Sequence, residues 1–234
     1  MNASLAGSRR FLPLLALASA LACTGTGRAA DGWTNLFNGK NLDGWEQHSG
    51  TAKYRVEDNC IVGQTVANTG NTFLCTKQTY GDFVLEFEFK VAQDMNSGVQ
   101  FRSEFYAKET EAEVNGKKKK FPADRVFGYQ YEIDPSPRAY TGGVYDEARR
   151  GWLVDLKNNA AAQKAFKNGD WNKARIECKG DHIQTFINGV KAADLKDSVT
   201  LKGIIALQVH GIGDGTKKKP GEEIRWRNIR LKQL

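Results

Sequence analysis

The chain has 234 residues and a formal charge of +7, with 40% hydrophobic and 10% aromatic residues. This composition supplies enough apolar side chains for a packed core, so we expect a compact globular protein. Much of the positive charge lies in two lysine runs, 117–120 and 217–219, each beside Gly or Pro. Neither run is interleaved with aromatic residues, which favours solvated loops over a nucleic-acid or other polyanion site.

The first 30 residues predict an export signal with a short linker, followed by one domain at residues 31–234. Arg9 and Arg10 precede an apolar stretch that is too short to span a bilayer and ends in the small-residue cleavage site Ala20-Leu21-Ala22. Cys23 follows directly and is a candidate for a lipid anchor, the one membrane attachment that we expect. The sequence therefore predicts an exported protein of the periplasm or cell envelope.

Short alternating runs separated by Gly, Asn and Asp recur from Tyr54 to the C-terminus, which predicts an antiparallel sandwich or barrel. A tight type I′ turn is expected at Asn188-Gly189. One stretch, Asn158 to Asn168, ends at Gly169 and predicts a short helix. In chain order, the clearest predicted strands are 83–91, 98–104, 128–134, 174–180, 182–195 as a hairpin, 204–211 and 223–231.

Two further features of the sequence carry separate expectations. Residues 105–127 form a long charged insertion, which predicts a loop or excursion between two central strands. Cys60 and Cys75 lie on successive strand-like runs, so an oxidising compartment would allow a disulfide between them and leave Cys178 unpaired.

Polar side chains alternate with apolar ones on three of the predicted strands, so they share one kind of face. A sandwich exposes one face of each sheet, and a solvated exterior is the simplest interpretation. Exteriors favour Lys, Thr and Ser, whereas amides, carboxylates, Arg and His suit a surface that binds polyols. The set comprises Gln100, Arg102, Glu104, Gln130, Glu132, Asp134, Gln208 and His210.

The segment after the third of these strands, residues 135–153, is rich in Gly, Pro, Arg and aromatics. Its X-Pro steps and Gly142-Gly143 predict a loop at the end of the strand. Tyr140, Tyr145 and Trp152 could stack on a sugar ring, with Arg138, Arg149 or Arg150 at its edge. The alternative is that Tyr145 and Trp152 only pin the loop to the sandwich.

The chain resembles the 3-keto-disaccharide hydrolase domain family, a group of exported bacterial proteins. The resemblance spans about Trp33 to Leu234 and implies an all-β fold, a concanavalin- or laminarinase-like jelly-roll sandwich of two antiparallel sheets with one short helix. The matching stretches are LFNGKNLDGW, FLCTKQTYGDFVLEFEFKV, NSGVQFRSE, GYQYEID, TGGVYD, WNKARIECKGDHIQTFING and GIIALQVHG through IRWRNIRL.

The resemblance implies cleavage of a glycosidic bond in a sugar that carries a ketone at carbon 3. The ketone acidifies the hydrogen on carbon 2, and the resulting enolate can expel the leaving sugar from carbon 1. This route needs a base, a group that stabilises the enolate oxygen and an acid for the leaving oxygen. From the shared face we predict His210 as the base and Arg102 at the enolate oxygen, with Glu132 or Asp134 as the acid or as the residue that orients the base.

Substrate-binding roles are expected for Gln100, Glu104, Gln130, Gln208, Tyr145, Trp152 and Arg138. A divalent cation held by Glu104, Glu132 and Asp134 is the alternative electrophile. No Gly-rich nucleotide fingerprint occurs, so the oxidation at carbon 3 would belong to a separate sugar 3-dehydrogenase, a functional partner upstream.

Two other functions remain open from the sequence. Jelly rolls host many lectins, so a non-catalytic carbohydrate-binding module is one alternative. An ordinary glycoside hydrolase is the other, because Glu132 and Asp134 stand two residues apart and could serve as its pair of carboxylates. An adaptor that docks a partner protein is disfavoured because the polar strand faces show no apolar patch.

Overall fold

The computed structural model describes residue 1 and residues 32–234, so the predicted leader and Cys23 lie outside the described residues. Within 32–234 no helix is long and apolar enough to cross a bilayer. The described chain is built from two large antiparallel sheets and one six-residue helix, which confirms the predicted all-β jelly-roll sandwich.

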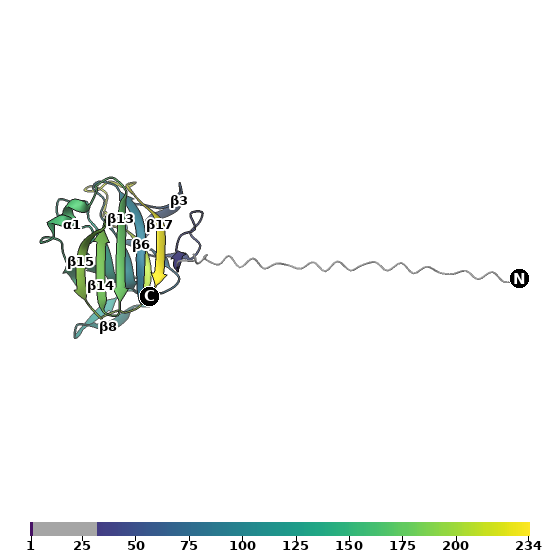
Figure 1. Cartoon of the computed structure of the whole chain (residues 1–234), viewed down its shortest axis with the longest axis horizontal. Helices are drawn as coiled ribbons and strands as arrows, with labels where there is room; N and C mark the ends of the chain where they lie inside the picture. The colour runs from purple at the N-terminus through teal and green to yellow at the C-terminus, as the bar shows by residue number, and fades with distance from the viewer. Residues whose placement is uncertain (2–31) are drawn as a thin grey trace.

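The larger sheet has eight strands in the order β15-β14-β13-β6-β17-β4-β3, with β1 paired on β17. Figure 1 shows β15, β14, β13, β6 and β17 side by side, with the helix at one end of the sheet. In chain order its strands are β1 (Trp33–Asn35), β3 (Lys53–Glu57), β4 (Cys60–Gln64), β6 (Phe83–Val91), β13 (Asn172–Lys179), β14 (His182–Ile187), β15 (Val190–Lys196) and β17 (Glu223–Gln233).

The second sheet has seven strands in the order β12-β11-β10-β7-β16-β5-β2. A separate hairpin, β8 (Thr110–Val114) with β9 (Lys117–Phe121), belongs to neither large sheet. The strands of the second sheet are β2 (Trp45–Ser49), β5 (Thr72–Thr76), β7 (Ser97–Ser103), β10 (Gly128–Ile133), β11 (Val144–Glu147), β12 (Gly151–Val154) and β16 (Ile204–Val209).

The core lies between the two sheets and follows the predicted alternation. On β6 the buried side chains of Phe87 and Phe89 point inward, and on β10 Tyr131 meets them, with its ring centroid 5.6 Å from that of Phe87. Burial of such large apolar side chains is the main force that holds the sheets together. As a result, Gln130 and Glu132 are turned to the outer face of the second sheet.

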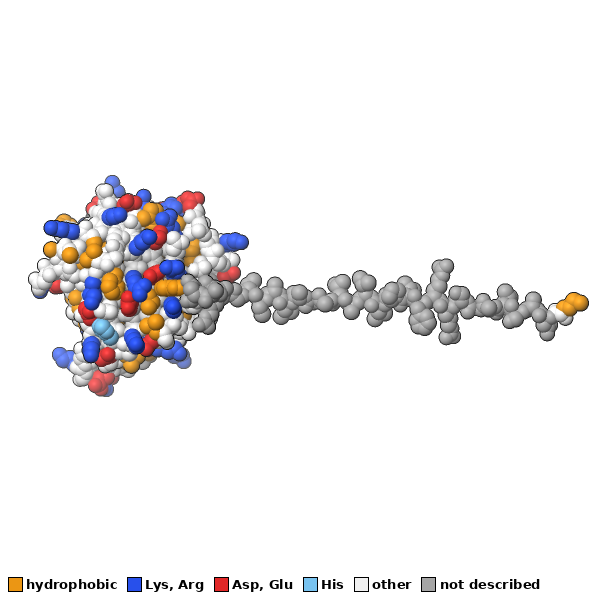
Figure 2. All heavy atoms as spheres, in the orientation of Figure 1, with side chains coloured by type: hydrophobic (Ala, Val, Ile, Leu, Met, Phe, Trp, Pro, Cys, Tyr) orange, Lys and Arg blue, Asp and Glu red, His pale blue; other side chains and the backbone are white. Residues whose placement is uncertain are grey.

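The outer face of the larger sheet is covered by charges of both signs, as Figure 2 shows. Glu86 on β6 pairs with Arg175 at 2.8 Å and with Arg230 at 2.6 Å, and Glu88 pairs with Arg227 at 2.8 Å. These partly exposed pairs are cross-strand neighbours, which stabilise a sheet modestly.

The helix and the tight turn agree with the sequence, although the helix is shorter than predicted. The helix α1 spans Ala160–Ala165, and the side chain of Asn159 caps it by accepting from the backbone N–H of Ala162. Asn188 and Gly189 have φ angles of 49° and 84°, as the type I′ turn between β14 and β15 requires.

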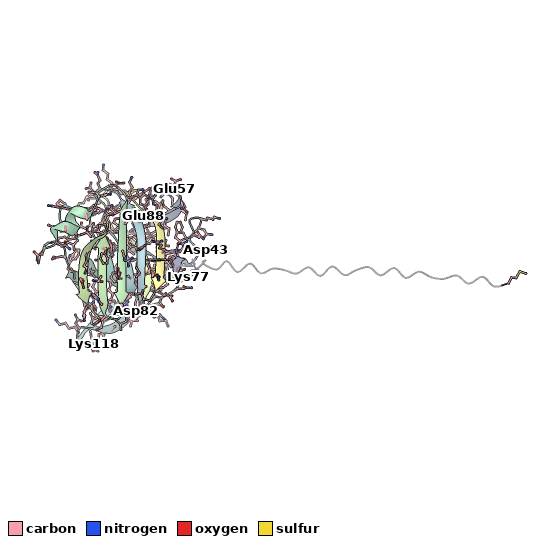
Figure 3. All side chains as sticks on the ribbon, in the orientation of Figure 1. Asp43, Glu57, Lys77, Asp82, Glu88 and Lys118 are labelled. Atoms are coloured by element: carbon pink, nitrogen blue, oxygen red, sulfur yellow. The ribbon has the colours of Figure 1, made fainter. Side chains whose placement is uncertain are left out.

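The insertion at residues 105–127 is an ordered excursion rather than a plain loop. It carries the β8–β9 hairpin, so the first lysine run lies on β9 and the prediction of a loop there is wrong. Figure 3 labels Lys118 on this hairpin, away from the body of the sandwich. The second run, 217–219, lies in the loop before β17, as predicted.

The predicted disulfide is wrong, because Cys60, Cys75 and Cys178 are all free thiols. Cys60 belongs to β4 of the larger sheet, whereas Cys75 belongs to β5 of the second sheet. Cys75 faces outward on that sheet and packs against Val126 of the excursion. The two sulfur atoms therefore lie on different layers of the sandwich.

Candidate functional site

A cavity of about 460 Å³ opens on the outer face of the second sheet, and we call it the Glu132 cavity. Seven of its lining residues were predicted from the sequence: Gln130, Glu132, Asp134, Arg138, Tyr145, Trp152 and His210. Five were not: Asn71, Asn96, Ser136, Glu147 and Lys218. The prediction that the faces of separate strands merge into one polar surface therefore holds for this part of the sheet.

The register of the sheet explains why distant segments meet here. Gln130 lies opposite Gln100 on one side and Tyr145 on the other, and directly opposite residues share a face. Val209 pairs with Thr72 on β5 and with Ser97 on β7. One step beyond these pairs, the same register places His210 between Asn71 and Asn96, and both of them line the cavity.

Like Asp134 just beyond β10, which is 1% exposed, Glu132 on β10 is buried, with 5% of its surface exposed. Its Oε1 accepts from Nδ2 of Asn96 at 2.7 Å, and its Oε2 accepts from Nε2 of Gln130 at 2.8 Å. Burial raises the pKa of Glu132 to about 7, although the two amide donors oppose this rise. Glu132 can therefore hold or release a proton near neutral pH.

His210 lies at the end of β16 with one ring nitrogen committed to the backbone. Its Nδ1 is 2.7 Å from the carbonyl oxygen of Gly211, and a carbonyl can only accept, so Nδ1 carries the hydrogen. The neutral ring then presents Nε2 as a lone pair. Burial lowers the pKa of His210, the Gly211 carbonyl raises it, and the charge of Lys218 lowers it further. The imidazole is therefore suited to act as a base.

The aromatic wall of the cavity comes from β11, β12 and the loop before them. The rings of Tyr145 and Trp152 meet edge to face with centroids 5.3 Å apart, and Tyr140 meets Trp152 at 5.2 Å. The guanidinium of Arg138 lies 5.9 Å from the Trp152 ring and 3.0 Å from Oδ2 of Asp134. This arrangement supplies an apolar ring face beside a fixed charge, which suits a sugar.

A third carboxylate, Glu147, was missed because it lies within residues 135–153, which were predicted as a loop but contain the short strand β11 and most of β12. Its Oε1 accepts from Arg125 at 2.6 Å and from Asn71 at 3.1 Å. The Asn71 side chain also accepts from the backbone N–H of Gly211, next to His210. These contacts hold the rim of the cavity around the imidazole.

Arg102 does not lie on the polar face, and its predicted placement is wrong. On β7 and β16, Gln100 pairs with Ala206 and Ser103 pairs with Ile204. Two residues of β7 therefore lie opposite one residue of β16, and this irregularity is a β-bulge. Arg102 has a φ of 46° at this bulge and is fully buried. It donates to the carbonyls of Gly81 and Gly180 and to Asp82, which Figure 3 labels at the lower end of the strands of the larger sheet.

Three predicted substrate contacts also lie outside the cavity lining. Gln100 and Gln208 are fully buried, and neither amide atom of Gln208 has a hydrogen-bond partner among the described residues. Glu104 pairs with the backbone of Phe127 and lines a different cavity, beside His48 and Tyr106. These positions do not support direct contact with a ligand in the Glu132 cavity.

The cation site predicted from Glu104, Glu132 and Asp134 is not assembled, because Glu104 lies at the other cavity. Among residues 32–234 no cluster of three His, Cys, Asp or Glu side chains is arranged to hold a metal ion.

The fold is a jelly-roll sandwich with a polar cavity on one outer face, and the family match places it among carbohydrate hydrolase-like domains. Residues 32–232 match the 3-keto-alpha-glucoside-1,2-lyase-like domain, and the chain belongs to this family. It is 27% identical over 159 residues to a 3-keto-disaccharide hydrolase of Bacteroides thetaiotaomicron. That match covers 63% of this chain and 52% of the relative, so the chain spans about half the length of the curated relative it matches.

Solved structures with the same fold include a protein of Parabacteroides distasonis that is provisionally named a glycosyl hydrolase. It has a TM-score of 0.54 and 19% identity, covering 88% of this chain and 95% of that one. A Bacillus subtilis protein of unknown function with a galectin-like fold also has a TM-score of 0.54, with 11% identity and coverage of 82% and 90%. At these identities the likeness describes the fold alone.

Proposed function

We propose that the domain cleaves the glycosidic bond of a 3-keto-glycoside by elimination followed by addition of water. The observation that carries this proposal is that Glu132 and His210 line one cavity. Their pKa values are shifted in opposite directions, upward for Glu132 and downward for His210. Burial leaves Glu132 able to keep a proton and leaves His210 without one. An acid and a base are thus available together, as this route requires.

In the first step, Nε2 of His210 removes the proton from carbon 2, and the electron pair forms the enolate of the carbon 3 ketone. The enolate then returns its electrons to form a double bond between carbons 1 and 2, and the bond from carbon 1 to the leaving oxygen breaks. Glu132 gives its proton to that oxygen. Water adds to carbon 1 and carbon 2 regains a proton, so the net reaction is hydrolysis.

The enolate oxygen needs a positive or hydrogen-bonding partner, and Arg102 is too far inside the sandwich to serve. Lys218 lines the same cavity and lies close enough to His210 to influence its pKa. We therefore assign this role to Lys218 and assign the aromatic wall with Arg138 to sugar binding. Export to the periplasm or envelope, with an upstream sugar 3-dehydrogenase, remains part of this proposal.

The decisive experiment incubates the purified chain with a glycoside and with its 3-keto form, with and without a chelator. Cleavage of the oxidised sugar alone is expected. Glu132→Gln and His210→Gln should each lower kcat by at least about a hundredfold with little change in KM, because general acid–base groups contribute at that level. Glu177→Gln and His182→Gln, on the outer face of the larger sheet, are matched controls and should retain wild-type rates.

A two-carboxylate glycoside hydrolase is the second candidate, because Glu132 and Asp134 both line the cavity. It predicts cleavage of the plain glycoside as well. Cleavage of neither sugar, together with measurable binding, would instead identify a carbohydrate-binding module and refute the proposed activity.

A further inference from the structure

A line of buried polar side chains runs beneath the Glu132 cavity and ends at Glu132. Oγ of Ser103 is 2.9 Å from Oε1 of Gln100, and Nε2 of Gln100 is 2.5 Å from Oε1 of Gln130. Nε2 of Gln130 is in turn 2.8 Å from Oε2 of Glu132. We call Ser103, Gln100 and Gln130 the amide chain. Ser103 and Gln100 do not line the Glu132 cavity.

The direction of the amide chain follows from the carboxylate at its end. An ionised carboxylate has no hydrogen to donate, so Gln130 must present its NH2 group to Glu132. Its carbonyl oxygen then points back and needs a donor, which the NH2 group of Gln100 supplies. The oxygen of Gln100 then faces the hydroxyl of Ser103, which also lies 3.0 Å from the carbonyl oxygen of Tyr129 and 3.2 Å from that of Phe101. While Glu132 is ionised, its carboxylate therefore sets the direction of both amides.

This direction decides where a proton on Glu132 can lie. Asn96 and Gln130, which also line the cavity, place one N–H on each carboxyl oxygen. Each oxygen keeps a further acceptor position, and Glu132 borders the cavity, so an added proton lies toward the cavity. If the Gln130 amide turned over, its oxygen would face Glu132 and bind that proton instead.

We propose that Gln100 and Ser103 are positioning residues, which keep the Gln130 amide from turning over and so hold the Glu132 proton toward the substrate. This inference rests on the proposed function, in which Glu132 donates that proton to the leaving oxygen. Reversal of Gln130 alone would leave its NH2 group facing that of Gln100, and two buried donors without acceptors are costly. Gln130 can therefore reverse only if Gln100 reverses with it and the Ser103 hydroxyl turns to the carbonyl of Tyr129.

Two backbone features place the amide chain. A Cβ on Gly98 would lie 2.4 Å from Cδ of Gln130, so the Gln130 side chain crosses the strand over this glycine. The bulge at Arg102 puts Ser103 on the outer face with Gln100, three residues earlier, where regular alternation would place it inside. The same irregularity that removes Arg102 from the polar face therefore brings Ser103 onto it.

The test measures the titration of Glu132 directly, by carboxyl ¹³C NMR of protein labelled on glutamate, with Glu132→Gln identifying the resonance. Gln100→Met, which removes the hydrogen bonds at similar volume, should raise the midpoint by about one pH unit, a tenfold change in the acid constant. Ser103→Ala should raise it by about half a unit, because Gln100 keeps its other contacts. In both variants kcat should fall severalfold while KM stays unchanged.

Val99→Ala is the matched control, because Val99 is the neighbour of Gln100 on β7 and faces the core. It should lower stability without moving the Glu132 midpoint. Unchanged or lowered midpoints in both amide-chain variants would overturn the proposal, and Ser103→Ala decides the matter if Gln100→Met fails to fold. The titration needs no substrate, so it gives a result even if the wild-type chain cleaves neither sugar.

Discussion

Burial shifts the pKa values of Glu132 and His210, the two central residues of the site, in opposite directions. Removal from water disfavours the charged form of any group, so the pKa of a carboxyl rises and the pKa of an imidazole falls. Glu132 is thereby raised to about 7, and His210 is lowered from its usual value of 6.5. At pH values above the lowered pKa of His210 and below about 7, both residues are uncharged. In that range the carboxyl of Glu132 keeps its proton and the imidazole of His210 presents a lone pair.

The proposed chemistry therefore predicts a bell-shaped dependence of kcat/KM on pH for the 3-keto-glycoside. Activity should rise as the pH increases through the pKa of His210, below 6.5, because the imidazolium loses its proton. It should fall above about 7, where Glu132 becomes a carboxylate. Glu132→Gln should remove the alkaline limb from the residual rate, and a flat profile across both limbs would contradict these assignments.

At the scale of single elements, the bulge in β7 converts a predicted catalytic residue into a structural one. The Arg102 guanidinium is enclosed between the sheets, where it satisfies two backbone carbonyls and pairs with Asp82 at 2.8 Å. It joins the start of β6 and the β13–β14 turn at Gly180 to the second sheet. We therefore expect its removal to affect stability rather than turnover.

Arg102→Met should lower the free energy of unfolding by about 3 kcal/mol, because it removes three hydrogen bonds made by a charged, fully buried side chain. Urea denaturation measures this loss, and kcat of the folded fraction should stay within about twofold of wild type. Arg55→Met is the matched control: Arg55 pairs with Glu57 and Glu223 at the surface, so its loss should cost about 1 kcal/mol or less. A large fall in kcat with normal stability would return Arg102 to the catalytic set.

The sequence predicts elements well where burial alternates strictly. Residues 83–91 coincide with β6, and Gln130, Glu132 and His210 lie on the predicted face. The prediction fails at Arg102 because a bulge reverses the alternation, and neither Gly nor Asn stands at the residue with positive φ to reveal it. The prediction also fails for Gln208, which lies on the predicted face of β16 but is fully buried and does not line the cavity.

The missed cavity residues share a different cause. Asn71 and Asn96 precede strands, Ser136 and Lys218 lie in loops, and Glu147 ends a four-residue strand. Such positions carry no periodic pattern, because their placement depends on which strands become neighbours. Only the sheet order, with β16 between β5 and β7, brings Asn71 and Asn96 to either side of His210.

At the scale of the whole molecule, a carboxyl group that is suited to catalysis weakens the fold at alkaline pH. The pKa of Glu132 is about 7 in the folded chain, against 4.5 as the ordinary value. The folded state therefore binds more protons than the unfolded state between these two values. Stability from this group is fully present below pH 4.5 and is lost as the pH rises through about 7.

Replacement of Glu132 by Gln removes this dependence and gives a test on the complete fold. Between pH 4 and pH 8, the difference in unfolding free energy between Glu132→Gln and wild type should shift by about 3 kcal/mol in favour of the variant. Urea denaturation at several pH values measures the shift, with Glu177→Gln as a control on the outer face of the larger sheet. A constant difference across this range would show that Glu132 titrates normally, and both the acid role and the amide chain would then lack their physical basis.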